Sequence, residues 1–595
     1  MMSKTFLSIL FFISILSTTK TYNTDISNIL EKIASDIFSQ SFLAENAYVV
    51  QSLMELINNR NSMTCTTCSF LVDVIKNFLL QKVGFDKFYQ IIKNICHITV
   101  FPAEVCDGAV DLYADLVVDS FFKRFLDGDW ICSLIKICQD TKEYESIEEF
   151  AERILKDKPE SIEREVVQRK NDEDYYKVVQ ITDIHLDMEY KEGTVANCVK
   201  PLCCRELKDD DLIPVKQTFA GFYGTIGKCD ANMEAVRAMA AKVKELNPDY
   251  ILFTGDNVGH SVWNIVQSDI IKATQMEIEA LQNELGLDIP ILPSIGNHEK
   301  APADEFHGKE AELLHGMADI FKPYLDKEAY ETFRNYGYYT VLIKEKLRII
   351  SLNCLLCDSF NLHLLYDSSQ PNKMFKWLEQ VLNSAERNGE IVHIVDHVPM
   401  HNSENTIQCA SRLKILMDRY QNTVRGFFSG HTHREYLSIV HEYYNETKPI
   451  HINFVGSGMT TFREYQQSFR MYLIDKKEKY IQDYTQFRMN LTESNEQKKP
   501  IWFIPYNATE FFGVTSMNDI ESMAKYRVTP DYVKHKYTDV PQAEERAKQE
   551  SEIKLAQCQY DYDYLMGVLN CNGYSVFSED YLYYLLNKLH VKWTK

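Results

Sequence analysis

The chain has 595 residues, of which 45% are hydrophobic and 25% are charged, and its formal net charge is −21. This composition is ordinary for a globular protein, and the length is sufficient for roughly three to four domains. The excess of negative charge argues against a nucleic-acid partner, because binding to nucleic acid needs a basic surface. It is compatible with a metal site, because metal ions bind carboxylates.

The N-terminus has the pattern of a secretory signal peptide, which we place at residues 1–22. Lys4 supplies a positive charge, and the apolar run from Phe6 to Leu16 is 11 residues long, too short to span a bilayer. A buried N-terminal helix is the alternative interpretation. Three Asn-x-Ser/Thr sequons are compatible with secretion and are candidate glycosylation sites. They are Asn445, Asn490 and Asn507.

The cysteine pattern indicates disulfides, because a secreted chain with 15 cysteines should pair all but one. Six of them lie between Cys65 and Cys138, separated by stretches with helical periodicity, which predicts a helical domain over residues 60–142. Residues 143–174 are charged and poor in large apolar side chains, and we expect a linker there.

From Tyr176 onward, short β-branched runs alternate with helical stretches, which is typical of a layered α/β domain. We place this domain at residues 175–490 and expect a Tyr-rich, helical region over residues 491–595. The predicted strands are 178–181, 250–253, 289–295, 349–352, 391–395, 424–428 and 450–455. The clearest predicted helices are 233–246 and 374–387.

Polar side chains follow several of these strands, at the edge where an α/β sheet gathers its ligands. Asp183 and His185 should point the same way, because residues two apart on an extended segment share a face. The mixed nitrogen and oxygen donors suit Zn²⁺, Mn²⁺ or Fe better than Ca²⁺ or Mg²⁺. The candidate ligands are Asp183, His185, Asp256, Asn297, His397, His431 and His433.

The order of these groups resembles the calcineurin-like metallophosphoesterase pattern: D-x-H, GD, GNH[E/D], H and GHxH, all present between residues 183 and 433. The resemblance implies a β-sandwich flanked by helices and a site for two divalent ions that acts on phosphate esters. It implies that one ion binds Asp183, His185, Asp256 and His433, and the other Asp256, Asn297, His397 and His431. His298 would donate to a phosphoryl or leaving-group oxygen, and His260 could be a second donor.

The first six cysteines have a spacing that resembles saposins, which are small helical bundles with three disulfides. The resemblance implies the pairs Cys65–Cys138, Cys68–Cys132 and Cys96–Cys106, whereas the sequence alone allows 15 connectivities. Such a module would handle lipid, and a purely structural cap is the alternative. The other expected disulfides use Cys198, Cys203, Cys204 and Cys229 in two local pairs, Cys357 with Cys409, and Cys558 with Cys571. Cys354 remains, and we expect a buried free thiol.

A saposin-like module ahead of such a phosphoesterase domain resembles the acid sphingomyelinase (sphingomyelin phosphodiesterase) family. The segments 255–263, 457–461 and 469–475 resemble blocks of that family, whereas Asp396 stands where the family has glycine. The resemblance implies a secreted or lysosomal monomer, with two ions that we expect to be Zn²⁺. It would act at the membrane surface and cleave sphingomyelin or a related phospholipid to ceramide and a phosphorylated head group. The alternatives are a phosphodiesterase of soluble nucleotides or head-group esters, and a non-catalytic lipid-transfer protein.

Overall fold

The computed structural model describes residues 102–134, 145–162, 171–207, 216–308 and 310–572, with isolated residues between 65 and 97 and at 138, 164 and 166. The predicted signal peptide, much of the predicted saposin-like module and the last 23 residues, 573–595, lie outside this description. None of the described helices combines the length and apolar composition needed to cross a bilayer.

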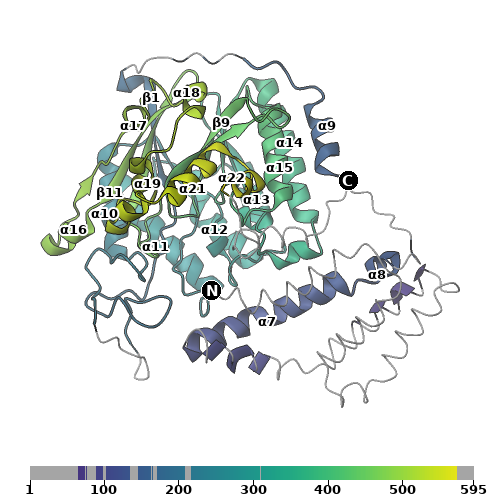
Figure 1. The fold of residues 1–595 in the computed structure, drawn as a ribbon, viewed down its shortest axis with the longest axis horizontal. Helices are drawn as coiled ribbons and strands as arrows, with labels where there is room; N and C mark the ends of the chain where they lie inside the picture. The colour runs from purple at the N-terminus through teal and green to yellow at the C-terminus, as the bar shows by residue number, and fades with distance from the viewer. Residues whose placement is uncertain are drawn as a thin grey trace.

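Two six-stranded sheets form the centre of the molecule and face each other as a sandwich (Figure 1). The first sheet has the order β12-β11-β10-β1-β2-β3 and the second has the order β4-β5-β6-β7-β9-β8. In the first sheet β1 pairs in parallel with β2 and antiparallel with β10. The strands are β1 Tyr175–Ile181, β2 Tyr250–Phe253, β3 Ile291–Pro293, β4 Tyr339–Lys344, β5 Leu347–Ser351, β6 Ile391–Val395, β7 Val424–Ser429, β8 Tyr436–His441, β9 Pro449–Val455, β10 Ser468–Asp475, β11 Ile481–Met489 and β12 Trp502–Phe503.

Helices connect and flank these strands, as the predicted α/β alternation requires. Helix α12 contacts β3 at the edge of the first sheet, and α14 contacts β6 of the second. The helices are α7 Ala103–Phe125, α8 Gly128–Leu134, α9 Ile147–Leu155, α10 Met233–Leu246, α11 Gln267–Leu285, α12 Ala311–Phe321, α13 Lys327–Tyr336, α14 Ser369–Asn388, α15 Ile407–Arg419, α16 Leu491–Gln497, α17 Ala508–Phe512, α18 Ile520–Ala524, α19 Pro530–Lys536, α20 Pro541–Arg546, α21 Glu550–Asp561 and α22 Leu565–Asn572.

The seven predicted strands are all present, because each is a short apolar run buried between helices and the opposite sheet. The structure adds β4, β8, β10, β11 and β12. Strands β10 and β11 lack a purely apolar pattern because they bury charged residues. Arg470 and Arg488 are 1% and 0% exposed and lie near Glu435, with nitrogen–oxygen distances of 3.7 and 2.5 Å. Pairing of these charges makes their burial tolerable.

The segment predicted as a linker contains α9, which packs against α15. Ser146 caps α9 by accepting a hydrogen bond from the Glu149 amide, and the Glu149 carboxylate accepts one from the Ser146 amide. Phe150 and Ile154 on one face of α9 are buried in the core of the α/β domain. This segment is therefore attached to the domain at α9.

Helix α7, in the region predicted to be saposin-like, packs directly on the α/β domain and runs below α12 in Figure 1. Val105 forms one apolar cluster with Leu202 and Trp263 of the domain. Farther along α7, the Tyr113 hydroxyl donates to the carbonyl of Ala303 at 3.4 Å. Both contacts lie on loops that also carry candidate site residues.

Seven disulfides connect the described cysteines, and Cys354 is free and buried. The three pairs in the predicted saposin-like region are those that the resemblance implies. The two local pairs, which the sequence left open, are Cys198–Cys203 and Cys204–Cys229. The remaining pairs are Cys357–Cys409 and Cys558–Cys571.

We expect the Cys354 thiol to be unreactive in the folded protein. Its side chain is 1% exposed, and burial raises the pKa of the thiol, so the reactive thiolate is suppressed. Iodoacetamide should label no described cysteine in native protein and label Cys354 alone after unfolding without reductant. Peptide mapping by mass spectrometry reads both states. A disulfide at Cys354, or rapid labelling before unfolding, would contradict the prediction.

Candidate metal centre

The seven candidate ligands, which are far apart in sequence, lie together where strands of both sheets end. Asp183 and His185 follow β1, Asp256 follows β2, and Asn297 follows β3 in the first sheet. The second sheet contributes His397 after β6 and two more histidines after β7. The last two are His431 and His433. The site is therefore a product of the sandwich and of neither sheet alone.

The backbone aims these side chains in a way that the sequence analysis did not foresee. Asp183 and His185 have φ values of 47° and 48°, so this segment is not extended and the predicted alternation argument is wrong. Asp256, His431 and His433 also have positive φ values of 61°, 71° and 57°. Non-glycine residues rarely adopt this region, and each such residue costs about 1–3 kcal/mol. Sharp turns at the strand ends, and not strand periodicity, point the donors inward.

The Asp256 carboxylate lies between histidines of the two sheets. Its Oδ2 atom is 3.4 Å from His185 Nε2 and 3.1 Å from His397 Nε2. His433 Nε2 lies 3.6 Å from Asp183 Oδ1 on one side of the centre, and His431 Nδ1 lies 3.0 Å from Asn297 Oδ1 on the other. Asp256 is thus in the position expected of a ligand shared by two ions.

The hydrogen bonds around the centre leave donor atoms available to cations. His185 Nδ1 and His397 Nδ1 lie 2.9 and 2.7 Å from the carbonyls of Val258 and Thr254, so these nitrogens carry protons and each Nε2 is the atom turned toward the carboxylates, where a cation would bind. His397 Nε2 and Asp183 Oδ1 are buried and have no hydrogen-bond partner within the described part of the chain. Buried, unpartnered acceptors beside carboxylates fit divalent metal ions.

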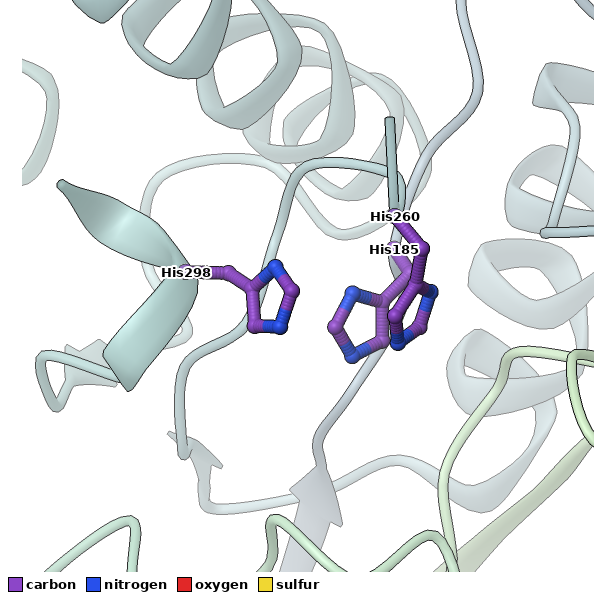
Figure 2. A group of neighbouring side chains, drawn as sticks. All are labelled: His185, His260 and His298. Atoms are coloured by element: carbon purple, nitrogen blue, oxygen red, sulfur yellow. The ribbon is translucent and has the colours of Figure 1, made fainter. Parts of the chain in front are cut away.

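Three histidines form a wall beside this centre, with His298 on one side and His185 and His260 stacked on the other (Figure 2). The ring centroids of His185 and His260 are 3.9 Å apart, and that of His298 is 4.9 Å from each of them. His260 also stacks on Phe462 at 4.2 Å, so it is not a loose surface residue. His260 and His298 therefore present imidazoles to the same space.

Burial controls the protonation of both donor candidates. It lowers the pKa of His298 to about 4, and burial followed by repulsion from His185 holds the pKa of His260 well below its usual value. Both rings are therefore neutral at neutral pH. A neutral imidazole keeps one N–H group, with which His298 can donate a hydrogen bond to an oxygen of a bound ester.

Asp230 is a site residue that the sequence analysis missed. Its Oδ1 lies 2.8 Å from His260 Nδ1, its Oδ2 accepts from the His260 backbone N–H at 2.7 Å, and Thr460 donates to Oδ1 at 2.7 Å. A carboxylate at Nδ1 fixes the ring so that Nε2 faces outward. The only sequence signal was its position next to Cys229, which does not distinguish it from other aspartates.

Glu299, which the sequence analysis noted as part of the GNH[E/D] block without a role, holds the two ligand loops together. Its carboxylate accepts backbone N–H groups from Asp256 at 2.9 Å, Asn257 at 2.7 Å and Gly296 at 2.5 Å. Burial, followed by repulsion from Asp256, raises the pKa of Glu299 to about 7. Close approach of these loops requires glycine, because a Cβ atom on Gly296 would lie 2.3 Å from Asp256 Oδ1.

The candidate glycosylation sites differ in exposure. Asn445 is exposed in the connection between β8 and β9. Asn490 is half-buried and caps α16, with its Nδ2 donating to Glu493 at 3.1 Å. Asn507 is half-buried and accepts a hydrogen bond from Thr485 at 2.8 Å.

We expect Asp256→Ala to abolish binding of both ions while leaving the fold nearly intact. Loss of the shared carboxylate removes an oxygen donor from each half of the centre. Metal analysis of the purified variant should find less than one equivalent of Zn²⁺ or Mn²⁺, with the thermal transition retained. The matched control is Asp187→Asn, because Asp187 is buried nearby but pairs with Arg205. Retention of two equivalents by Asp256→Ala would contradict the shared position.

Comparisons with known proteins agree with this architecture. The family model for calcineurin-like phosphoesterases matches residues 176–435. Sphingomyelin phosphodiesterase B of Dictyostelium discoideum is 25% identical over 523 residues, 84% of this chain and 80% of that protein. Sphingomyelin phosphodiesterase of Bos taurus is 29% identical over 469 residues, 76% of this chain and 74% of that protein. A human cyclic GMP-AMP phosphodiesterase is 25% identical over 354 residues, 57% of this chain and 75% of that protein. The chain is thus a hydrolase with a calcineurin-like metallophosphoesterase domain, and it is a homologue of the sphingomyelin phosphodiesterases.

Proposed function

We propose that this protein is a zinc-dependent phosphodiesterase that cleaves sphingomyelin, or a closely related phospholipid, to ceramide and a phosphorylated head group. Two kinds of observation support the proposal. The relatives named as sphingomyelin phosphodiesterases align with most of the chain. The observation that carries it is the packing of α7, a helix outside the phosphoesterase domain, on the loops that carry His260 and His298.

The proposed ligands are those of the sequence analysis. One ion would be held by Asp183, His185, Asp256 and His433, and the other by Asp256, Asn297, His397 and His431. When bound, two divalent ions polarise phosphoryl oxygens and activate water. Nitrogen-rich donor sets of this kind favour Zn²⁺. His260 and His298 would face a phosphate bound at this centre.

The histidine wall would act on the leaving-group oxygen. His260 and His298 are neutral in the metal-free protein, and His298 can donate its one N–H to the phosphoryl or leaving oxygen. Asp230 would hold His260 in the tautomer that has its proton on Nδ1, so proton transfer to the product requires a second proton on Nε2. The negative charge of Asp230 would stabilise this imidazolium against the burial that lowers the pKa of His260.

The helix packing suggests how a lipid would reach this wall. Val105 of α7 shares an apolar cluster with Trp263 and with Phe462, the residue whose ring stacks on His260. An apolar cluster thus connects α7 with the residue that stacks on His260. We propose that residues 60–142 are a saposin-like module that presents the lipid, with the protein acting peripherally at a membrane surface.

The proposed compartment is lysosomal or extracellular. Disulfides form and persist in oxidising compartments, and the described residues contain seven. We also propose that residues 1–22 are removed as a signal peptide and that the mature protein is a monomer.

The second candidate function is hydrolysis of a soluble diester by the same centre. The human relative named as a cyclic GMP-AMP phosphodiesterase favours it, because that protein matches 57% of this chain. The discriminating experiment compares phosphocholine release from sphingomyelin vesicles with hydrolysis of a cyclic dinucleotide by the same zinc-loaded enzyme. Phosphocholine release at the higher kcat/KM supports the lipid function. Cleavage of the dinucleotide without release of phosphocholine would refute it.

We expect deletion of residues 60–142 to reduce hydrolysis of vesicle-embedded lipid at least tenfold more than hydrolysis of a soluble chromogenic diester. The reason is that only the lipid must leave a bilayer to reach the centre. The deletion uncovers Leu202 and Trp263, so the soluble-diester rate serves as the control for folding. An equal fall in both rates would mean that the module is a structural cap.

We expect Asp230→Asn to lower kcat roughly 10- to 100-fold, which is a smaller loss than removal of a general acid would cause. The variant should still bind two metal equivalents. The amide can still hold the ring but no longer stabilises its protonated form, so the low-pH limb of the rate profile should also move. Thr460→Val is the milder control, because it removes one donor to Asp230 and leaves the carboxylate. Unchanged kcat and pH profile in Asp230→Asn would exclude a positioning role.

A further inference from the structure

Two carboxylates outside the metallophosphoesterase pattern contact the ligands on one side of the centre. Asn297 Nδ2 donates to Asp304 Oδ1 at 2.8 Å. His431 Nε2 lies 2.9 Å from Glu404 Oε2. Neither carboxylate is among the candidate ligands. Each contacts the part of its neighbour that faces away from the centre.

These contacts decide which atom each ligand turns inward. A carboxylate accepts but cannot donate, so Asp304 fixes the NH₂ group of Asn297 toward itself and turns Oδ1 the other way. For the same reason Glu404 places a proton on His431 Nε2 and leaves the lone pair on Nδ1. Asn297 Oδ1 and His431 Nδ1 then face one another at 3.0 Å, as two donors to one ion would.

The loops that carry the two carboxylates are themselves well held. Asp304 has a φ of 70°, and its backbone N–H donates to the Asn297 carbonyl at 3.0 Å, which closes the loop. The Glu404 backbone N–H donates to the side chain of Asn402 at 2.8 Å, and its carbonyl accepts from Ser359 at 2.7 Å. Both carboxylates are therefore placed by the fold before any ion binds.

Within the described residues, side-chain carboxylates outside the ligand set contact the side chains of second-ion ligands only. Backbone carbonyls hold one imidazole on each side: Val258 contacts Nδ1 of His185 on the side of the first ion, and Thr254 contacts Nδ1 of His397 on the side of the second. Any sequence that adopts this fold would supply such a carbonyl, whereas Asp304 and Glu404 are specific side chains. An anionic acceptor also raises the basicity of the imidazole that it holds.

We propose that Asp304 and Glu404 are positioning residues that orient Asn297 and His431 toward the second ion and set its affinity separately from that of the first. The inference rests on the ligand assignment within the proposed function. It adds to that function the expectation that changes at Asp304 or Glu404 weaken binding of the second ion and not of the first.

The rival explanation is a general effect of changing any buried acidic side chain near the centre, for which the chain offers a matched control. Asp358 is a fully buried carboxylate that interacts electrostatically with both Asp304 and Glu404. Its Oδ1 accepts from the Phe360 amide at 2.7 Å, and it contacts no candidate ligand within the described residues. Asp358→Asn therefore alters a buried acidic side chain in the same neighbourhood without disturbing either contact.

The experiment measures stepwise Zn²⁺ affinity of the full-length protein by chelator competition and counts bound ions by elemental analysis. The variants are Glu404→Gln, Glu404→Ala and Asp304→Asn, the last chosen because asparagine tolerates the positive φ. We expect the weaker of two binding steps to lose about 10- to 100-fold in affinity, with Glu404→Ala affected more than Glu404→Gln. The stronger step, and the melting temperature of metal-free protein, should stay unchanged.

Three outcomes would overturn the inference: equal weakening of both steps, an equivalent loss in Asp358→Asn, or unchanged affinities in all variants. Activity on lipid is measured separately with wild-type protein. If the predicted affinity pattern holds but phosphocholine is not released, the lipid substrate is wrong and the positioning role stands. If phosphocholine is released but the affinities do not change, the positioning role is wrong and the function stands.

Discussion

The concentration of acceptor atoms around Asp256 is the constraint on which this structure depends. Its Oδ2 lies within 3.4 Å of one imidazole nitrogen from each sheet, and Asp183 Oδ1 and His397 Nε2 are buried nearby with no hydrogen-bond partner among the described residues. Such a cluster repels itself in a low-dielectric interior unless cations neutralise it. The rest of the fold must hold these groups in place against that repulsion. It does so through the backbone turns that carry the ligands and through contacts from segments distant in sequence.

The turns at the strand ends provide the first layer of that support. Asp183, His185 and Asp256 have left-handed backbone conformations that only a rigid surrounding structure sustains. Glu299 supplies part of this rigidity by binding three backbone amides at once. The centre is thus preorganised, which is what catalysis by fixed charges and hydrogen bonds requires.

The second layer comes from segments distant in sequence. Glu435 lies two residues after His433 and is held by Arg488 at 2.5 Å and by the Tyr506 hydroxyl at 2.8 Å. Arg488 also pairs with Asp539 in the C-terminal helical region, so that region supports a ligand loop. Near the other end of the described chain, α7 packs against Trp263 and Phe462, and the Phe462 ring stacks on His260. Segments at both ends of the described chain therefore stabilise the catalytic domain.

The sequence alone determined the α/β class, the seven strands and the seven ligand candidates, because apolar runs that end in Asp, Asn or His are local features. It did not determine how Asp183 and His185 point, because their conformation comes from turns that periodicity does not encode. Nor did it single out Asp230, Asp304 or Glu404, since an isolated carboxylate has no local signature. Only the tertiary structure brought each one within 2.9 Å of its partner, because these contacts join loops distant from one another or sharply folded back on themselves.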